Sequence, residues 1–114
     1  MDRQAFGQRL ADFQATKFTL AELSTEVEVA QMFLDRCIRD HVARALTDVE
    51  AAMCKWWVTE RQQRVVTRSL QLHGGYGYMQ EYPIAQEFMD ARASTLYAGS
   101  TEIMKEIIGR SLVR

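Results

Sequence analysis

Residues 71–79 read Gln71-Leu72-His73-Gly74-Gly75-Tyr76-Gly77-Tyr78-Met79, and this stretch divides the chain into two helical halves. Three glycines in four positions interrupt a helical pattern, and Pro83 follows at a place suited to the first turn of the next helix, where no backbone donor is needed. Glycines also let another backbone or a ligand approach closely. Because two tyrosines and a methionine accompany them, we expect this loop to contact something flat or bulky, either a neighbouring helix or a ligand.

The composition predicts a small, soluble, all-α protein. The chain has 114 residues, 47% of them hydrophobic and 25% charged, which is enough for one folded domain. A single proline and many strong helix formers favour helices, and there is no β-type alternation or internal repeat. The formal net charge of −1 includes no basic patch, so we expect neither a nucleic-acid partner nor an anionic membrane partner.

Leader, membrane and metal signals are all weak. The residues after Met1 lack the apolar run of a signal peptide, and no stretch reaches the roughly 20 apolar residues that a membrane span requires. Cys37 and Cys54 both fall in helical patterns. We expect them to be buried small residues in a reducing compartment, and not disulfide partners or metal ligands.

A first long helix is expected from about Thr16 to Ala45. Its apolar residues recur in steps of three and four, as in a helical bundle, at Leu20, Leu23, Val27, Ala30, Leu34, Cys37 and Ile38. Met32, Phe33 and Val42 widen this stripe, which favours more than one partner helix. The charged residues are expected to form a solvated face: Glu22, Glu26, Glu28, Asp35, Arg36, Arg39 and Asp40. His41, near the helix end, is expected to be a surface histidine.

The second helix is expected to begin at a capping box, in which Thr47 and Glu50 each cover the other's free amide, and to run to about Leu72 or His73. Trp56 and Trp57 cannot point the same way on a helix. We expect one of them in the core and the other against a partner helix or subunit.

Two shorter helices complete the prediction. The third runs from Pro83 to about Ser94, and the last begins after Gly99 with Ser100 as its N-cap. The free amides at that N-terminus could contact an anion or phosphate, although a capping serine is more often structural. The result is an antiparallel helical bundle with two glycine breaks that could share one edge. These patterns alone name no reaction.

Three segments occur in a distinctive order. The first contains Arg3, Phe6, Gly7 and Gln14, and the second is the glycine loop with Glu81-Tyr82-Pro83. The third joins Asp90-Ala91-Arg92 to Tyr97-Ala98-Gly99-Ser100-Thr101-Glu102-Ile103. Together they resemble the C-terminal helical domain of the acyl-CoA dehydrogenases. The resemblance covers almost all of residues 1–114, and its middle and last motifs are specific when they occur together, whereas the first alone is weak.

This resemblance implies a flavoenzyme that desaturates an acyl-CoA at its α,β bond. In the family a carboxylate takes the α-proton, FAD takes the β-hydride, and an electron-transfer flavoprotein reoxidises the flavin. It also implies a dimer or tetramer with FAD between domains and across a subunit interface. The expected compartment is the cytoplasm, or the mitochondrial matrix for a eukaryotic parent.

Family positions transfer to this chain residue by residue. They imply that the FAD contacts are Arg3, Phe6, Gln14, Gln71, Gly74, Gly75, Ser100 and Glu102. Ala98 and Gly99 are expected beside the substrate. Arginine and helix-end amides suit phosphate oxygens, which agrees with these roles.

Ala98 departs from the commonest family pattern. Many members carry the catalytic glutamate at this position, and a methyl group cannot accept a proton. Glu102 matches a cofactor position and is no substitute, so the sequence contains no assigned catalytic residue. In the long-chain and isovaleryl-CoA branches the base comes from an earlier helix. The sequence around Met79 and the residues Ile103-Met104-Lys105-Glu106 resemble the long-chain branch more closely.

The resemblance implies that the two preceding domains and the first helix of the C-terminal domain are not in this sequence. We therefore expect a truncated C-terminal domain that has no activity by itself, binds FAD weakly at best and self-associates. Two alternatives stay open: a non-catalytic helical oligomerisation module, or a subunit that completes the flavin site of a separate chain. Whether the parent transfers electrons to a flavoprotein or to oxygen also stays open.

Overall fold

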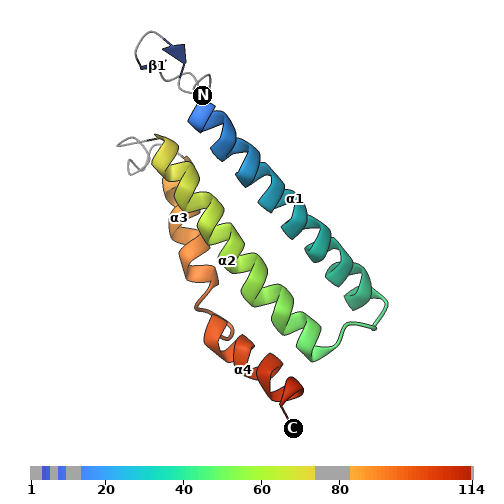
Figure 1. The fold of residues 1–114 in the computed structure, drawn as a ribbon. Coiled ribbons are helices and arrows are strands. Elements are labelled where there is room, and N and C mark those ends of the chain that lie inside the picture. Colours follow the sequence, from blue (N-terminus) through green and yellow to red (C-terminus); the bar gives the residue numbers. More distant parts are fainter. Residues whose placement is uncertain (1–3, 6–7, 10–13, 74–82, 114) are drawn as a thin grey trace.

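A computed structural model describes residues 4–5, 8–9, 14–73 and 83–113 of the chain (Figure 1). In this part of the chain the helices are α1 (Gln14–Val42), α2 (Asp48–His73), α3 (Pro83–Ser94) and α4 (Thr101–Leu112). The all-α fold is confirmed, and the helix bounds agree closely with the predicted ones. One small difference is an antiparallel pair of two-residue strands, β1 (Gln4–Ala5) and β2 (Gln8–Arg9), which are too short to show an alternating pattern.

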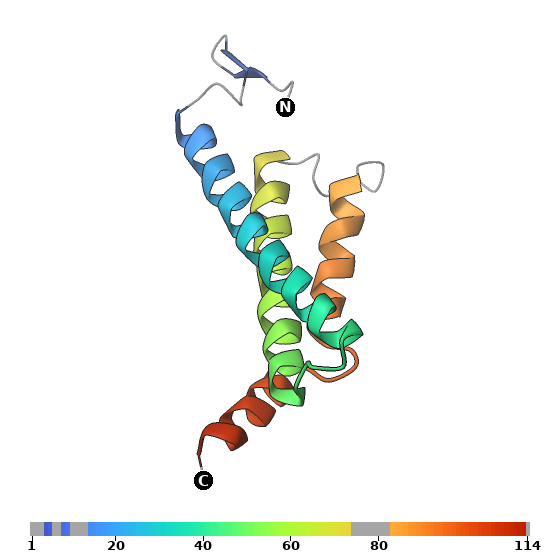
Figure 2. The same cartoon turned by 90° about the vertical axis from the view of Figure 1, so that its right-hand side faces the viewer.

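Helix α2 is the centre of the fold. It makes the main contacts with α1, α3 and α4 (Figures 1 and 2). Helices α1 and α2 form a long antiparallel hairpin, so the start of α1 and the end of α2 lie at the same end of the molecule (Figure 1). Helix α3 runs back along the second half of α2, and α4 continues in the same direction along its first half.

The core is narrow and follows α2. Its buried apolar residues in the described part of the chain are Leu23, Cys37, Ala52, Val66, Leu70 and Ala91. Buried hydroxyls accompany them where α3 ends: Ser94 Oγ donates to the carbonyl of Ala91 at 2.6 Å, and Thr95 Oγ1 donates to the carbonyl of Arg92 at 2.9 Å. These bonds satisfy polar groups that would otherwise be costly to bury.

The apolar stripe predicted on α1 is only partly covered. Leu23 and Cys37 are buried against α2. Val27 and Ile38, in contrast, remain 48% and 51% exposed, and Met32, which widens the stripe, is 65% exposed. One helix cannot cover a stripe this wide, because a helix contacts its neighbour along a narrow seam.

The predicted solvated face of α1 is partly a seam between helices. Arg64 Nε donates to Glu26 Oε1 at 2.8 Å, and Arg68 Nη1 lies 3.1 Å from Glu22 Oε2. The prediction is therefore wrong for Glu26, whose side chain is only 22% exposed, whereas Glu22 stays 61% exposed as expected while it pairs with Arg68. The periodicity of a single helix cannot reveal that charged residues flanking an apolar stripe reach across to an antiparallel neighbour.

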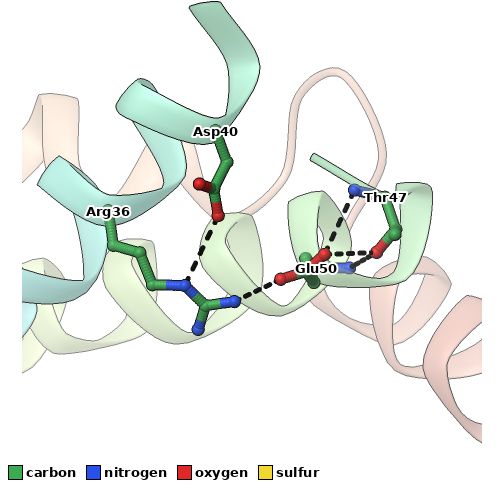
Figure 3. A network of polar contacts seen from close by, with 4 residues as sticks. All are labelled: Arg36, Asp40, Thr47 and Glu50. Atoms are coloured by element: carbon green, nitrogen blue, oxygen red, sulfur yellow. Dashed lines mark hydrogen bonds and ion pairs between the residues drawn. The ribbon is translucent and has the colours of Figure 1, made fainter. Parts of the chain in front are cut away.

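The capping box at the start of α2 is confirmed and is tied to α1 (Figure 3). The Thr47 N–H donates to Glu50 Oε1 at 3.3 Å, and the Glu50 N–H donates to Thr47 Oγ1 at 3.1 Å. Arg36 of α1 then binds Glu50 Oε2 and also pairs with Asp40 Oδ2 at 3.5 Å. This network links the last turns of α1 to the first turn of α2.

The remaining sequence predictions have mixed outcomes. Neither Trp56 nor Trp57 is in the core, because both are half-buried and line one apolar groove with Val29, Phe33, Met53 and Ile108.

His41 is exposed in the last turn of α1, as expected. Both cysteines are free thiols, Cys37 buried and Cys54 half-buried. Within the residues placed by the structure, no helix has the length and apolar character to cross a membrane.

Candidate functional site

The predicted site residues fall into three sets. Arg3, Phe6, Gly74 and Gly75 lie outside the described residues. Gln14 and Gln71 lie on the α1–α2 hairpin, and the residues from Ala98 to Glu102 join α3 to α4.

Gln14 and Gln71 lie at the same end of the molecule. Gln14 is the first residue of α1, Gln71 is in the last turn of α2, and the two helices are antiparallel (Figure 1). Both side chains are exposed. Each amide can donate and accept hydrogen bonds, so both could contact a polar ligand that lies across this end.

The turn from Tyr97 to Ser100 has an unusual backbone. Ala98 has φ 55° and Gly99 has φ 99°, both in the left-handed region that residues with a Cβ avoid. Ser100 then starts α4 as its N-cap, with Oγ accepting the Ile103 N–H at 3.4 Å. The predicted N-cap is confirmed, and the turn presents Ala98 with its methyl group exposed.

Two side chains of α2 form hydrogen bonds to this turn and to residues on either side of it. Lys55 Nζ donates to the carbonyl of Gly99 at 2.6 Å and to the carbonyl of Ser94 at 3.3 Å. Further along the helix, Glu60 Oε1 accepts the Thr101 hydroxyl at 2.7 Å. Sequence reasoning missed Lys55 and Glu60. These bonds join positions 39 to 44 residues apart, and no local pattern marks them.

A small hollow lies beside the start of α4. Its volume is about 320 Å³, and it is lined by Glu60, Gln63, Arg92, Thr95, Leu96, Thr101 and Glu102. Arg92 supplies positive charge, although its Nη1 already donates to Thr95 Oγ1 at 2.6 Å. Gln63 Oε1 is buried without a hydrogen-bond partner in the structure. The hollow is therefore lined mainly by polar and charged side chains.

The hairpin residues and the turn residues do not form one cluster. Gln71 lies about 16 Å further along α2 than Glu60, at 1.5 Å per residue. The first glycine break, at residues 74–77, lies outside the described residues, so the interpretation that both breaks share one edge stays a prediction. A single small ligand cannot contact both groups. A long ligand, or two copies of one ligand, can.

Among the residues that the structure describes, no three histidine, cysteine, aspartate or glutamate side chains gather closely enough to hold a metal ion. The groups at this site that could bind a ligand are the backbone donors at the start of α4 and the polar side chains near it.

Known proteins resemble the chain in sequence and in fold. The family model described as the acyl-CoA dehydrogenase C-terminal domain matches residues 1–113. The mitochondrial long-chain specific acyl-CoA dehydrogenase of Rattus norvegicus is 45% identical over 111 residues, which are 97% of this chain and 26% of that protein. The CarC subunit of the caffeyl-CoA reductase–Etf complex of Acetobacterium woodii is 31% identical over 113 residues, covering 99% of this chain and 30% of CarC.

A solved structure gives the same answer for the fold. An acyl-CoA dehydrogenase from Geobacillus kaustophilus superposes with a TM-score of 0.93 at 47% identity, covering 98% of this chain and 30% of that one. The chain therefore spans between about a quarter and a third of the length of the proteins that it matches.

Proposed function

The chain belongs to the acyl-CoA dehydrogenase family, as its C-terminal domain, and we propose that it supplies one wall of an FAD site and a subunit interface in an enzyme that desaturates acyl-CoA. One observation carries this proposal. The described polar residues that match the family's cofactor positions lie at two separate levels along α2: Gln14 and Gln71 are exposed at the hairpin end, and at the start of α4 Glu102 is exposed and Ser100 is half-buried. An extended dinucleotide bound between subunits needs contacts distributed in this way.

The chain's own residues bind and orient in this function. Gln14 and Gln71 offer amide donors and acceptors at the hairpin end. Ser100 accepts the Ile103 N–H with Oγ, which leaves its hydroxyl proton free to donate to a ligand oxygen. The positive end of the α4 dipole favours negative charge at the same place. FAD, when bound, supplies the acceptor for the hydride that leaves the acyl β-carbon.

The proposal assigns no proton transfer to the turn. Ala98 and Gly99 have no ionisable group, and their small size leaves room for an acyl thioester beside the turn. We assign removal of the α-proton to a carboxylate elsewhere in the whole protein. In the matched relatives, about 70% of the length lies outside the region that this chain covers. The chain alone is therefore expected to be inactive.

Exposed apolar residues on two flanks of α1 support the interface part of the proposal. Phe18, Val29 and Met32 share one flank of α1 and are 60%, 49% and 65% exposed. Leu20, Val27 and Ile38 share the opposite flank and are 38%, 48% and 51% exposed. Large apolar side chains left exposed along a helix favour contact with another chain or segment. We propose that this contact builds a dimer or tetramer.

The relatives suggest the electron acceptor and the compartment. CarC carries Etf in the name of its complex, so we propose an electron-transfer flavoprotein as partner for the whole enzyme. The rat relative is mitochondrial. We accordingly propose the matrix in a eukaryotic cell and the cytoplasm in a bacterium.

A complementation experiment tests the proposal. The chain, carrying an affinity tag, is co-expressed with the part of the Geobacillus kaustophilus enzyme that precedes the matched region. We expect a complex that carries flavin, seen by its visible absorbance, and that bleaches when acyl-CoA is added. A complex of both parts without flavin would overturn the proposal.

Matched variants sharpen this test. Gln71→Ala should reduce the bound flavin, whereas Gln62→Ala, an exposed glutamine lower on the same helix, should not. Equal flavin content in the two variants would remove Gln71 from the site. A chain that self-associates but recruits neither the remaining domains nor flavin would instead favour the alternative function, a non-catalytic helical oligomerisation module.

A further inference from the structure

Lys55 makes an unusual set of contacts for a helix lysine. It is half-buried on α2, and its ammonium group donates to two main-chain carbonyls, Gly99 O at 2.6 Å and Ser94 O at 3.3 Å. It also lies 5.8 Å from the ring centroid of Tyr97, within the range of a cation–π interaction. Lysines on helices usually extend into water, so this inward placement calls for a reason.

The two carbonyls belong to the parts of the backbone that most need an outside partner. Ser94 is the last residue of α3, where helix carbonyls have no partner within the helix and the dipole end is negative. Gly99 follows Ala98 in the left-handed region, which is unfavourable for alanine. A turn of this kind persists only when its surroundings hold it.

Helix α2 holds the turn at two points. Lys55 binds the carbonyl of Gly99, and Glu60 binds the hydroxyl of Thr101, two residues further along the chain. Hydrogen bonds from a charged donor are stronger than neutral ones. Only Ser100 lies between these two attachments, and Ala98 directly precedes the first of them.

We propose that Lys55 is a positioning residue for the reaction: without touching a ligand, it fixes the turn at residues 97–100 so that Ala98, Gly99 and Ser100 face the acyl thioester and the flavin. This assignment rests on the proposed function for its ligands, and on the geometry of the chain for the turn itself.

The first experiment measures the turn in the chain alone. Hydrogen exchange is compared in three variants. Lys55→Met keeps the length of the side chain but loses its donors, and Lys55→Arg keeps the charge. Lys17→Met is the control, at an exposed position on α1. In Lys55→Met we expect the amides of Thr101 and Ile103 to exchange about tenfold faster, because a charged hydrogen bond is lost. Lys55→Arg should restore part of the protection, and Lys17→Met should change nothing there. Unchanged protection in a folded Lys55→Met chain would overturn the proposal.

A measurement on the unaltered chain covers the case in which Lys55→Met does not fold. Heteronuclear NMR can resolve lysine ammonium protons when hydrogen bonds slow their exchange with water. We expect slow exchange for Lys55 and fast exchange for Lys17. Equally fast exchange for both lysines would contradict the proposed clamp.

The second experiment uses the complemented flavoprotein described above. With flavin content unchanged, Lys55→Met should lower kcat by about tenfold through misplacement of the turn, and Lys55→Arg should recover part of the loss. A role limited to folding would lower flavin content and thermal stability, and leave kcat per flavin as in Lys17→Met. That result would overturn the positioning role. If even the unaltered chain gives no flavin complex, the proposed function fails, while the exchange data still decide whether Lys55 holds the turn.

Discussion

The hydroxyl of Thr101 donates a hydrogen bond to Oε1 of Glu60 at 2.7 Å, joining the start of α4 to the middle of α2. Thr101 is only 6% exposed, and its N–H also donates to the carbonyl of Thr95 at 3.1 Å. One residue thus connects three parts of the fold, namely α2, the end of α3 and the start of α4. The position of α4 depends on this point.

Replacing Thr101 should therefore destabilise the fold. Thr101→Val keeps the shape but leaves a half-buried carboxylate oxygen without its donor, which should cost about 1–2 kcal/mol in the free energy of unfolding. Urea denaturation followed by circular dichroism measures this loss. Thr25→Val is the control, because the Thr25 hydroxyl is exposed and bonds only to the Ala21 carbonyl of its own helix. An equal loss in both variants would contradict the special role of Thr101.

Glu50 should make the fold sensitive to acid. Hydrogen bonds from the Thr47 side chain and the Thr47 backbone, followed by the charge of Arg36, hold the pKa of Glu50 below its ordinary value of 4.5. Because the folded pKa is lower than the unfolded one, the stabilisation is complete above about pH 4.5 and is lost as the pH falls through the folded pKa. We expect the difference in urea midpoint between the wild type and Glu50→Gln to shrink between pH 7 and pH 3. Glu28→Gln, at an exposed position of α1, is the control and should follow the wild type.

Arg44 occupies a position that favours glycine. Its φ is 58°, its N–H donates to the His41 carbonyl at 3.0 Å, and the next N–H, of Ala45, donates to the Asp40 carbonyl at 2.7 Å. This is a Schellman motif, whose left-handed residue is most often glycine. Arg44→Gly should therefore raise the free energy of unfolding by about 0.5–1 kcal/mol, even though glycine makes the unfolded chain more flexible. Thermal unfolding measures the change, and a lower midpoint would show that the arginine side chain contributes more than the strain costs.

The helix bounds could be predicted because their signals are local. The Thr47–Glu50 capping box, Pro83 at the start of α3 and Ser100 at the start of α4 each act within about one turn of helix. The family could be predicted because its motifs recur at a specific spacing. Neither inference requires knowing which helix packs against which.

The parts that could not be predicted are contacts between distant positions. Lys55 reaches Gly99 across 44 residues, and Arg64 reaches Glu26 across 38 residues. Each side chain alone resembles an ordinary charged residue on a helix surface. The same limit applies to the site, because the separation of Gln71 from Ser100 depends on how α3 and α4 pack along α2.

Gly99 and Gly109 should respond to alanine in opposite ways. Gly99 has φ 99°, so alanine there is strained; its Cβ would also meet Met104 Cε at 2.6 Å, although that flexible end can move. We expect Gly99→Ala to cost about 1–3 kcal/mol. Gly109 lies inside α4 with nothing within 4 Å of a new Cβ, so Gly109→Ala should stabilise by about 1 kcal/mol. Urea denaturation of both variants is the measurement, and a change of the same sign in both would contradict the argument from φ.

Cys54 should react slowly with alkylating reagents while the chain is folded. Burial, together with a hydrogen bond to the neighbouring Cys37 thiol, raises the pKa of Cys54 from 9.0 to about 11. The reactive species is the thiolate, and a pKa higher by about two units leaves about 100-fold less of it at pH 8. We expect iodoacetamide to modify Cys54 about 100-fold more slowly in the folded wild-type chain than in the wild-type chain unfolded in urea. Peptide mass spectrometry follows the modification. The Cys37→Ser substitution removes the neighbouring thiol but leaves Cys54 equally buried. Part of the protection of Cys54 from iodoacetamide should therefore remain. Equal rates in the folded and unfolded wild type would show that Cys54 is accessible and ionises freely.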